Sequence, residues 1–207
     1  MYLEKSVFWS YINSEKNRQE TALTLEKYVN EELQPLKLED ANFRVNILSK
    51  EEQNWNASGG NSVSFLVRLN KGSNEGEIHK VSSGGELSRL MLAVNLVLAD
   101  SLNRKTLIFD EVDAGIGGAV AAAVGERLAK LSEDIQVLTI THSPQVAAYG
   151  LQHLKISKSE KNGSIVTQVT ELDKNEKNEE IARMLAGVKI TDEARAAAAS
   201  LLFRGTP

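Results

Sequence analysis

The chain has 207 residues, of which 42% are hydrophobic and 25% charged, and its formal net charge is −4. This composition is that of an ordinary globular protein, and the net charge argues against a general polyanion binder while leaving room for a local basic patch. The lack of cysteine excludes disulfides and thiolate metal sites. Apolar runs are too short to span a bilayer, and the first residues do not resemble a signal peptide. We therefore expect a cytoplasmic protein without membrane association.

The first 35 residues predict one long helix. Ala22, Leu25, Val29 and Leu33 are spaced three, four and four apart, which is a helical stripe. The preceding segment, NSEKNRQET, is polar on all sides. This pattern suits the helical base of a coiled-coil arm that leaves a domain, and it also suits an ordinary surface helix. We take residues 1–35 as the arm base and residues 36–207 as a globular domain.

Two alternating segments come next, NFRVNIL at 42–48 and SVSFLVRL at 62–69. Each places apolar residues at every second position, which predicts two half-buried strands of an antiparallel hairpin. Loops at 49–61 and 70–77 surround the second strand. We expect this hairpin to be scaffold.

The stretch VSSGGELSRLMLAVNLVLAD, residues 81–100, places flexible residues directly before a helical pattern. One interpretation is a turn followed by a core helix. The other is an anion site, because free N–H groups and the dipole at a helix start attract phosphate. Gly84 and Gly85 would let a phosphate approach the backbone, and Ser83 would add a hydroxyl donor. Glu86 stabilises the first helical turn in either case.

Two short apolar runs, in KTLIFDE and IQVLTITHS, flank a helix predicted at 119–131. Continuous apolar strands that alternate with helices predict a parallel sheet covered on both faces. Ligands of such sheets bind at the carboxyl ends of the strands. The first run ends in Asp110 and Glu111, and the second ends in Thr141 and His142, so we expect these residues at one edge.

The adjacent carboxylates are candidates for metal-assisted chemistry. Two like charges this close repel one another, and Mg²⁺ relieves the repulsion by taking one carboxylate together with waters and phosphate oxygens. Asp110 would hold the metal, and Glu111 would orient or deprotonate a water. His142 could donate to a phosphate oxygen. The alternative is that the acids cap a loop in solvent and that the histidine is structural.

The last 55 residues predict a hairpin that turns near Asn162 and Gly163, and then two helices. Gly187 would end the first helix and Thr191 would cap the second. Lys155, Lys158 and Lys161 predict a small basic strip, which could contact nucleic-acid phosphates or simply face solvent.

Taken together, the motifs resemble the carboxyl-terminal half of an ABC-type ATPase head. SSGGE is similar to the ABC signature, TLIFDE to Walker B, VDAG to the D-loop and THS to the switch histidine, in the family's order. The segments DEVDAGIGG, THSPQVAA and EEIARMLAG narrow the resemblance to the RecN family of SMC-like ATPases, which act in repair of DNA double-strand breaks. The resemblance runs from about Phe43 to the carboxyl terminus, and Ser82 stands where many members have a small apolar residue.

The resemblance implies a role for each matching residue. Ser83, Gly84, Gly85 and Glu86 would form the signature segment that contacts the γ-phosphate of ATP held by a partner head. Asp110 would bind Mg²⁺ through water, Glu111 would act as general base, and His142 would sense the γ-phosphate. Asp113 would lie at the interface between heads. The family also implies ATP-driven homodimerisation of heads, DNA binding and a nucleoid-associated location.

No G-x-x-x-x-G-K-[ST] phosphate loop occurs in the sequence. We therefore expect a partial head, whether a fragment or one product of a split gene, that needs an amino-terminal lobe with the Walker A motif. Alone it should be nearly inactive. The alternative function is a non-catalytic dimerisation module of an SMC-like ABC protein, and a transporter-type fragment is disfavoured by Glu86 and the helical stub.

Overall fold

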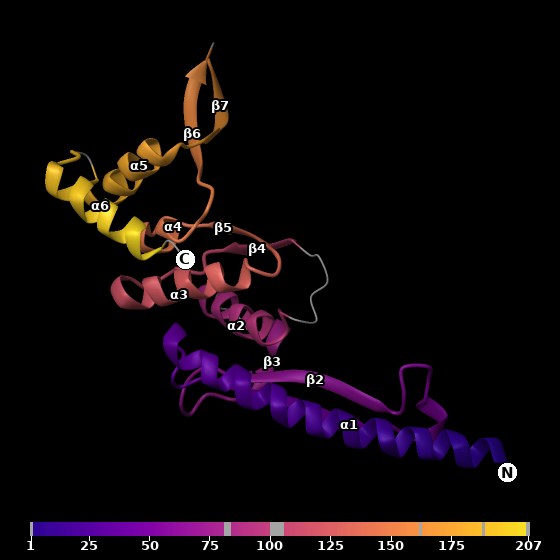
Figure 1. Ribbon diagram of the computed structural model, residues 1–207. Coiled ribbons are helices and arrows are strands. Elements are labelled where there is room, and N and C mark those ends of the chain that lie inside the picture. The colour runs from indigo at the N-terminus through magenta and orange to yellow at the C-terminus, as the bar shows by residue number, and fades with distance from the viewer. Residues whose placement is uncertain (1, 81–83, 100–105, 162, 188, 206–207) are drawn as a thin grey trace. The chain divides into compact units, whose positions relative to one another are not determined.

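The computed structural model describes residues 2–80, 84–99, 106–161, 163–187 and 189–205 (Figure 1). The chain forms two compact units, Met1–Leu98 and Ala99–Pro207, called unit 1 and unit 2 below. The boundary expected near residue 35 separates an arm from a head and stays a prediction, because these units divide the chain by contacts elsewhere. Within the described residues, no helix is both long and apolar enough to cross a membrane.

Unit 1 combines one long helix, a three-stranded sheet and a second helix. Its helices and strands are α1 Tyr2–Leu33, β1 Asn42–Ser49, β2 Asn61–Arg68, β3 Gly76–Glu77 and α2 Gly84–Val97, with 3-10 turns at Gln34–Leu36, Glu52–Asn54 and Ile78–Lys80. The predicted hairpin is confirmed: β1 and β2 pair antiparallel from Asn42 with Arg68 to Ser49 with Asn61. The short β3, which lies in the expected loop, extends the order to β1-β2-β3.

The helix α1 packs along β1, which is an edge strand. Val29 and Leu33 are fully buried, as is Phe43 of β1. The Asn30 amide donates to the Phe43 carbonyl at 2.8 Å and accepts from the Phe43 N–H at 2.9 Å, and the Glu26 carboxylate accepts from the Val45 N–H at 2.7 Å. Helix side chains thereby satisfy backbone groups that an exposed edge strand would leave open.

The polar middle of α1 has specific partners on the hairpin. The Arg18 guanidinium donates to the Asn61 side-chain oxygen at 2.9 Å and also to the Ser58 carbonyl. The Ser49 hydroxyl donates to Glu15 at 2.9 Å. This part of the helix therefore lacks apolar residues because it meets a polar hairpin tip, and hydrogen bonds replace hydrophobic packing there.

Unit 2 alternates strands with helices and ends in a helical pair. Its elements are β4 Thr106–Asp110, α3 Gly118–Leu131, β5 Gln136–Ile140, α4 Pro144–Ala148, β6 Leu154–Lys161, β7 Ser164–Glu171, α5 Lys174–Ala186 and α6 Asp192–Arg204. The predicted parallel pair is confirmed: β4 and β5 align from Thr106 with Gln136 to Asp110 with Ile140. The short α4 was not predicted.

The expectation that this parallel sheet is covered on both faces is wrong for the described residues. Ile108, Leu138 and Ile140 retain 66%, 44% and 59% of their surface. Their neighbours Leu107 and Phe109 point the other way and are more buried. Because side chains alternate along a strand, one face of the pair is packed and the other is apolar but open.

The carboxyl-terminal helices α5 and α6 pack around Ile181, Ala182 and Ala198, which are fully buried. Asp173 begins α5 with a capping box, since its carboxylate accepts from the Asn175 and Glu176 amides at 2.8 Å. The predicted stop at Gly187 and cap at Thr191 are both confirmed. Local chemistry therefore sets both ends of this helical pair.

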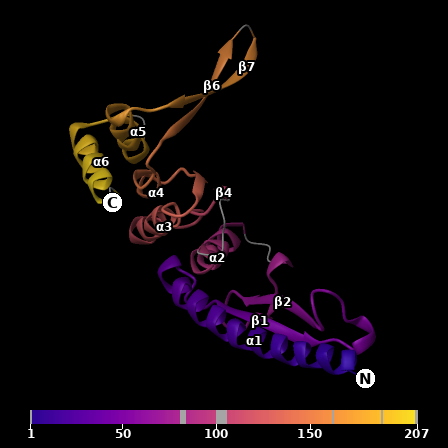
Figure 2. The same ribbon diagram turned by 45° about the vertical axis from the view of Figure 1, so that its right-hand side comes forward.

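The hairpin β6–β7 is also confirmed, and its turn end lies away from α5 and α6 in both views (Figures 1 and 2). Lys155 at its base forms an ion pair with the buried Glu180 of α5 at 2.6 Å. Lys158, three residues on, projects from the opposite face of the strand. The predicted basic strip is therefore divided between two faces, and one of its members already has an acidic partner.

Candidate functional site

The two candidate acids, Asp110 and Glu111, lie where β4 ends. Asp110 is the last residue of the strand, pairs with Ile140 in the parallel register and is exposed. Glu111 is also exposed and has a φ of 57°. A left-handed backbone is costly for any residue other than glycine. The chain accepts this cost where it turns sharply out of the sheet, and the Ala114 N–H donates to the Glu111 carbonyl at 3.0 Å to close the turn.

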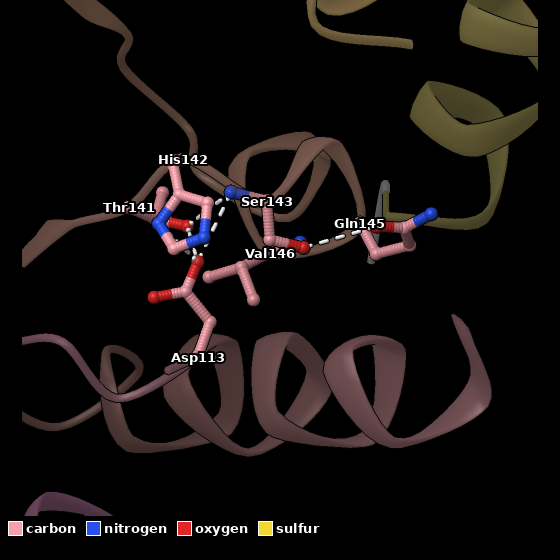
Figure 3. Close-up of polar contacts among 6 residues, drawn as sticks. All are labelled: Asp113, Thr141, His142, Ser143, Gln145 and Val146. Carbon is pink, nitrogen blue, oxygen red and sulfur yellow. Dashed lines mark hydrogen bonds and ion pairs between the residues drawn. The ribbon is translucent and has the colours of Figure 1, made fainter. Parts of the chain in front are cut away.

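Immediately after the acids the chain turns inward. Val112 is fully buried and Asp113 is 1% exposed. One oxygen of Asp113, Oδ2, accepts from the Thr141 hydroxyl and, at 3.0 Å, from the Ser143 N–H (Figure 3). The other oxygen, Oδ1, is buried without a hydrogen-bond partner. A buried carboxylate from the β4 turn thus anchors the turn that follows β5.

His142 lies at the surface of this second turn. Its side chain is 84% exposed, and its Nδ1 lies 3.7 Å from Asp113 Oδ2. That separation is too long for a hydrogen bond but close enough for electrostatic attraction to a protonated ring. Ser143 then caps α4, with its hydroxyl accepting from the Val146 N–H and donating to Gln145. The histidine is therefore held by its backbone neighbours while its ring remains accessible (Figure 3).

The glycine-rich segment belongs to unit 1. Ser83 lies outside the described residues, and the described helix begins at Gly84, which is exposed. Gly85 is buried and Glu86 is half-buried. Leu90 and Val94 of this helix are buried, whereas Met91 is 37% exposed.

Further along α2, Arg89 is 5% exposed, an unexpected position for a guanidinium. Burial lowers the pKa of Arg89, while the charge of Glu86 opposes that change. The buried side of α2 therefore includes a charged residue as well as apolar ones.

The structure thus brings together four of the predicted residues: Asp110, Glu111, Asp113 and His142 all lie at the carboxyl ends of β4 and β5. The expectation that Asp113 faces a partner head stays a prediction, although its carboxylate has partners within its own chain. Sequence reasoning missed the roles of Thr141 and Ser143. The sequence offered no signal for these roles, because they depend on the burial of Asp113, which only the fold reveals.

The side chains at this edge suit Mg²⁺ that is bound together with a nucleotide. Among the described residues there is no group of three or more His, Asp or Glu side chains that could enclose an ion. Magnesium bound to a nucleotide usually takes one or two protein ligands, with waters and phosphate oxygens completing the octahedron. The exposed carboxylate of Asp110 fits that arrangement and does not fit an all-protein cage.

The chain is similar to curated proteins called DNA repair protein RecN. It is 44% identical over 179 residues to the protein of Rickettsia prowazekii, a match that covers 86% of this chain and 32% of the relative. For Vibrio cholerae the values are 41% over 188 residues, 91% and 34%, and for Rickettsia felis 41% over 202 residues, 98% and 37%. The chain thus spans about a third of the length of these relatives.

Two solved structures show the same fold. An Smc head domain with a coiled coil and joint from Pyrococcus yayanosii aligns with a TM-score of 0.54 at 22% identity, covering 87% of this chain and 34% of that one. An Smc head domain with an extended coiled coil from Pyrococcus furiosus, bound to the C-terminal domain of ScpA, aligns with 0.52 at 21%, covering 89% and 44%.

A search against models of protein families found no match. The sequence similarity nevertheless extends over most of the chain, and it agrees with the resemblance carried by the motifs. The fold is that of part of an SMC-type ATPase head, and the chain belongs to the family of the DNA repair protein RecN.

Proposed function

We propose that this chain is the carboxyl-terminal lobe of a RecN-type ATPase head and supplies part of a composite site that hydrolyses ATP during repair of DNA double-strand breaks. The observation that carries the proposal is the shared edge of β4 and β5. There, Asp110 and Glu111 leave one strand and His142 leaves the other, and Asp113 connects the two turns.

Each residue has a distinct proposed task. Bound Mg²⁺ would neutralise charge on the phosphates, and Asp110 would hold it through water. Glu111 would accept a hydrogen bond from the attacking water and take its proton. His142 would donate to a γ-phosphate oxygen through its exposed ring. These tasks require positioned, accessible side chains, and all three residues are exposed at this edge.

The signature segment would act on a second nucleotide. The amino-terminal end of a helix presents N–H groups and the positive end of the helix dipole, which together favour phosphate. Gly84 and Gly85, with Ser83 and Glu86, would face ATP held by another head, so that ATP joins two heads. The Smc relatives support this proposal at the level of fold alone.

A separate lobe would provide the phosphate loop. The sequence contains no G-x-x-x-x-G-K-[ST], and that loop supplies most of the binding energy for the β- and γ-phosphates. We therefore expect this chain alone to bind ATP weakly and to hydrolyse almost none. A lobe carrying the loop should restore turnover, either joined to this chain or added to it.

The test is ATP hydrolysis by this chain mixed with the Walker A lobe of a RecN relative. We expect activity only in the mixture, and Glu111→Gln should reduce kcat by about a hundredfold or more. Glu133→Gln is the matched control, because Glu133 is an exposed acid in the loop before β5. Full turnover by the purified chain alone, with Glu111→Gln inactive, would contradict the composite site.

The same mixture tests the alternative function. Formation of a dimer without Glu111-dependent turnover would identify a non-catalytic dimerisation module instead. DNA binding, cytoplasmic location and association with the nucleoid are proposed from the RecN relatives only. A DNA-binding assay over a salt series addresses the first, since phosphate contacts weaken as salt rises.

A further inference from the structure

The carboxylate of Asp113 is buried, and both of its hydrogen bonds come from the turn that carries His142. Its side chain is fully inaccessible, it accepts hydrogen bonds from the Thr141 hydroxyl and the Ser143 N–H, and the His142 ring lies 3.7 Å away. Burying a carboxylate for two neutral donors is unfavourable compared with leaving it in water. The two hydrogen bonds that this carboxylate accepts join the turn after β4 to the turn after β5.

We infer that Asp113 is a positioning residue, which fixes the turn that carries Glu111 to the turn that carries His142. This inference rests on the proposed function, because it concerns the geometry of the same site. Asp113 follows Glu111 by two residues, and its two partners flank His142 on either side. A shift of either turn would therefore be transmitted through one carboxylate oxygen, Oδ2.

The backbone supports this assignment. Glu111 holds a left-handed conformation with a φ of 57°, which persists only where surrounding contacts enforce it. Val112 and Asp113 are the contacts that follow it, and both are buried. Asp113 also accepts a hydrogen bond from the Ile116 N–H at its backbone carbonyl, 3.3 Å away, which continues the turn.

Thr141 offers the sharpest test, because Val and Ser separate its shape from its hydroxyl. Thr141→Val keeps the branched shape and removes both the donor to Asp113 and an acceptor of the Ser143 N–H. Thr141→Ser keeps the donor and removes the methyl group. If Thr141 only fills space, Val should preserve activity better than Ser. If it orients the site through Asp113, the order is reversed.

The activity experiment uses the mixture with the Walker A lobe. We expect Thr141→Ser to keep kcat within about threefold of the unaltered protein, and Thr141→Val to lower it about ten- to a hundredfold, the usual effect of losing a residue that orients a functional one. The KM for ATP should change little in both. Thr167→Val, on the exposed β7, controls for a valine elsewhere in unit 2. Equal kcat for Val and Ser variants overturns the inference.

A second experiment needs no activity. The Ser143 N–H donates to both Asp113 Oδ2 and Thr141 Oγ1, so this experiment uses this chain alone with Thr141→Val as the background. There, Asp113→Ala should accelerate amide hydrogen exchange at Ser143 about tenfold, the equivalent of one net hydrogen bond, while Asp113→Asn keeps an acceptor and should slow this loss. Unchanged exchange in Asp113→Ala overturns the inference even if the mixture is active. Absence of Glu111-dependent turnover in the unaltered mixture would contradict the proposed function. The exchange result would still decide whether Asp113 joins the two turns.

Discussion

Gly125 in the middle of α3 allows close contact between α3 and α4, and replacing it should reveal how tightly the second turn is held. A Cβ added there would lie 2.5 Å from Tyr149 Cδ2 and 3.1 Å from its Cγ. Normal carbon contacts lie near 3.5–4.0 Å, so the ring would have to move by about 1 Å. Tyr149 caps the carboxyl end of α4, and α4 begins two residues after His142.

The expected sign follows from two opposing effects. Alanine is favoured over glycine within a helix by about 1 kcal/mol, whereas overpacking a filled site costs about 1–3 kcal/mol. Because Cγ is the stiff base of the tyrosine ring, the second effect should win, and Gly125→Ala should destabilise unit 2 by about 1 kcal/mol. In a Tyr149→Ala background the obstruction is gone, so the same change should stabilise unit 2 by about 1 kcal/mol.

Native-state hydrogen exchange at the α3 amides is the suitable assay. Both tryptophans, Trp9 and Trp55, belong to unit 1, so tryptophan fluorescence would report on the wrong part of the chain. The four proteins form a double-mutant cycle, and the coupling between positions 125 and 149 should reach about 2 kcal/mol. If Gly125→Ala has the same sign in both backgrounds, the close contact does not constrain α4 as argued.

Two changes elsewhere in unit 2 give further tests. Asp173→Ala removes the capping box of α5 and should cost about 1 kcal/mol in hydrogen-exchange stability; Asp173→Asn should cost less, and equal losses would argue against the cap. Burial lowers the pKa of His153, Lys177 lowers it further, and the charge of Glu180 opposes them. The unfolded histidine therefore takes up a proton first, so its contribution is complete above a pH of about 6.5 and is lost as the pH falls towards the folded pKa. His153→Gln should reduce the slope of stability between about pH 7 and 5.5, and an unaltered slope would rule out His153 as its source.

Periodicity alone predicted most of the elements, because their patterns are local. The alternation at 42–48 and 62–69 gave β1 and β2, and the caps at Gly187 and Thr191 gave the ends of α5 and α6. Elements that depend on distant partners were missed. The two residues of β3 lack a pattern of their own and form a strand only because they pair with β2.

Part of the candidate site was predictable from the sequence. Parallel strands that end in polar residues predict one shared edge, and Asp110, Glu111 and His142 lie there. The burial of Asp113 was not predictable, because a carboxylate is normally exposed. Only the fold reveals that the chain turns inward after Glu111 and that Asp113 meets Thr141, which lies 28 positions further along the chain.

The open apolar face of the β4–β5 pair lies beside the carboxylate that we propose to hold Mg²⁺. Ile108 and Asp110 are two residues apart in β4 and so share a face, and Ile140 is the register partner of Asp110. Any lobe that covers Ile108, Leu138 and Ile140 must therefore also approach the carboxylate proposed to hold Mg²⁺. Burying what these three side chains still expose would contribute about 2.5–5 kcal/mol in all, which is about what a millimolar complex requires and far less than a micromolar one. A second lobe must then gain most of its affinity elsewhere, or be joined to this chain, for the phosphate loop to remain beside Asp110.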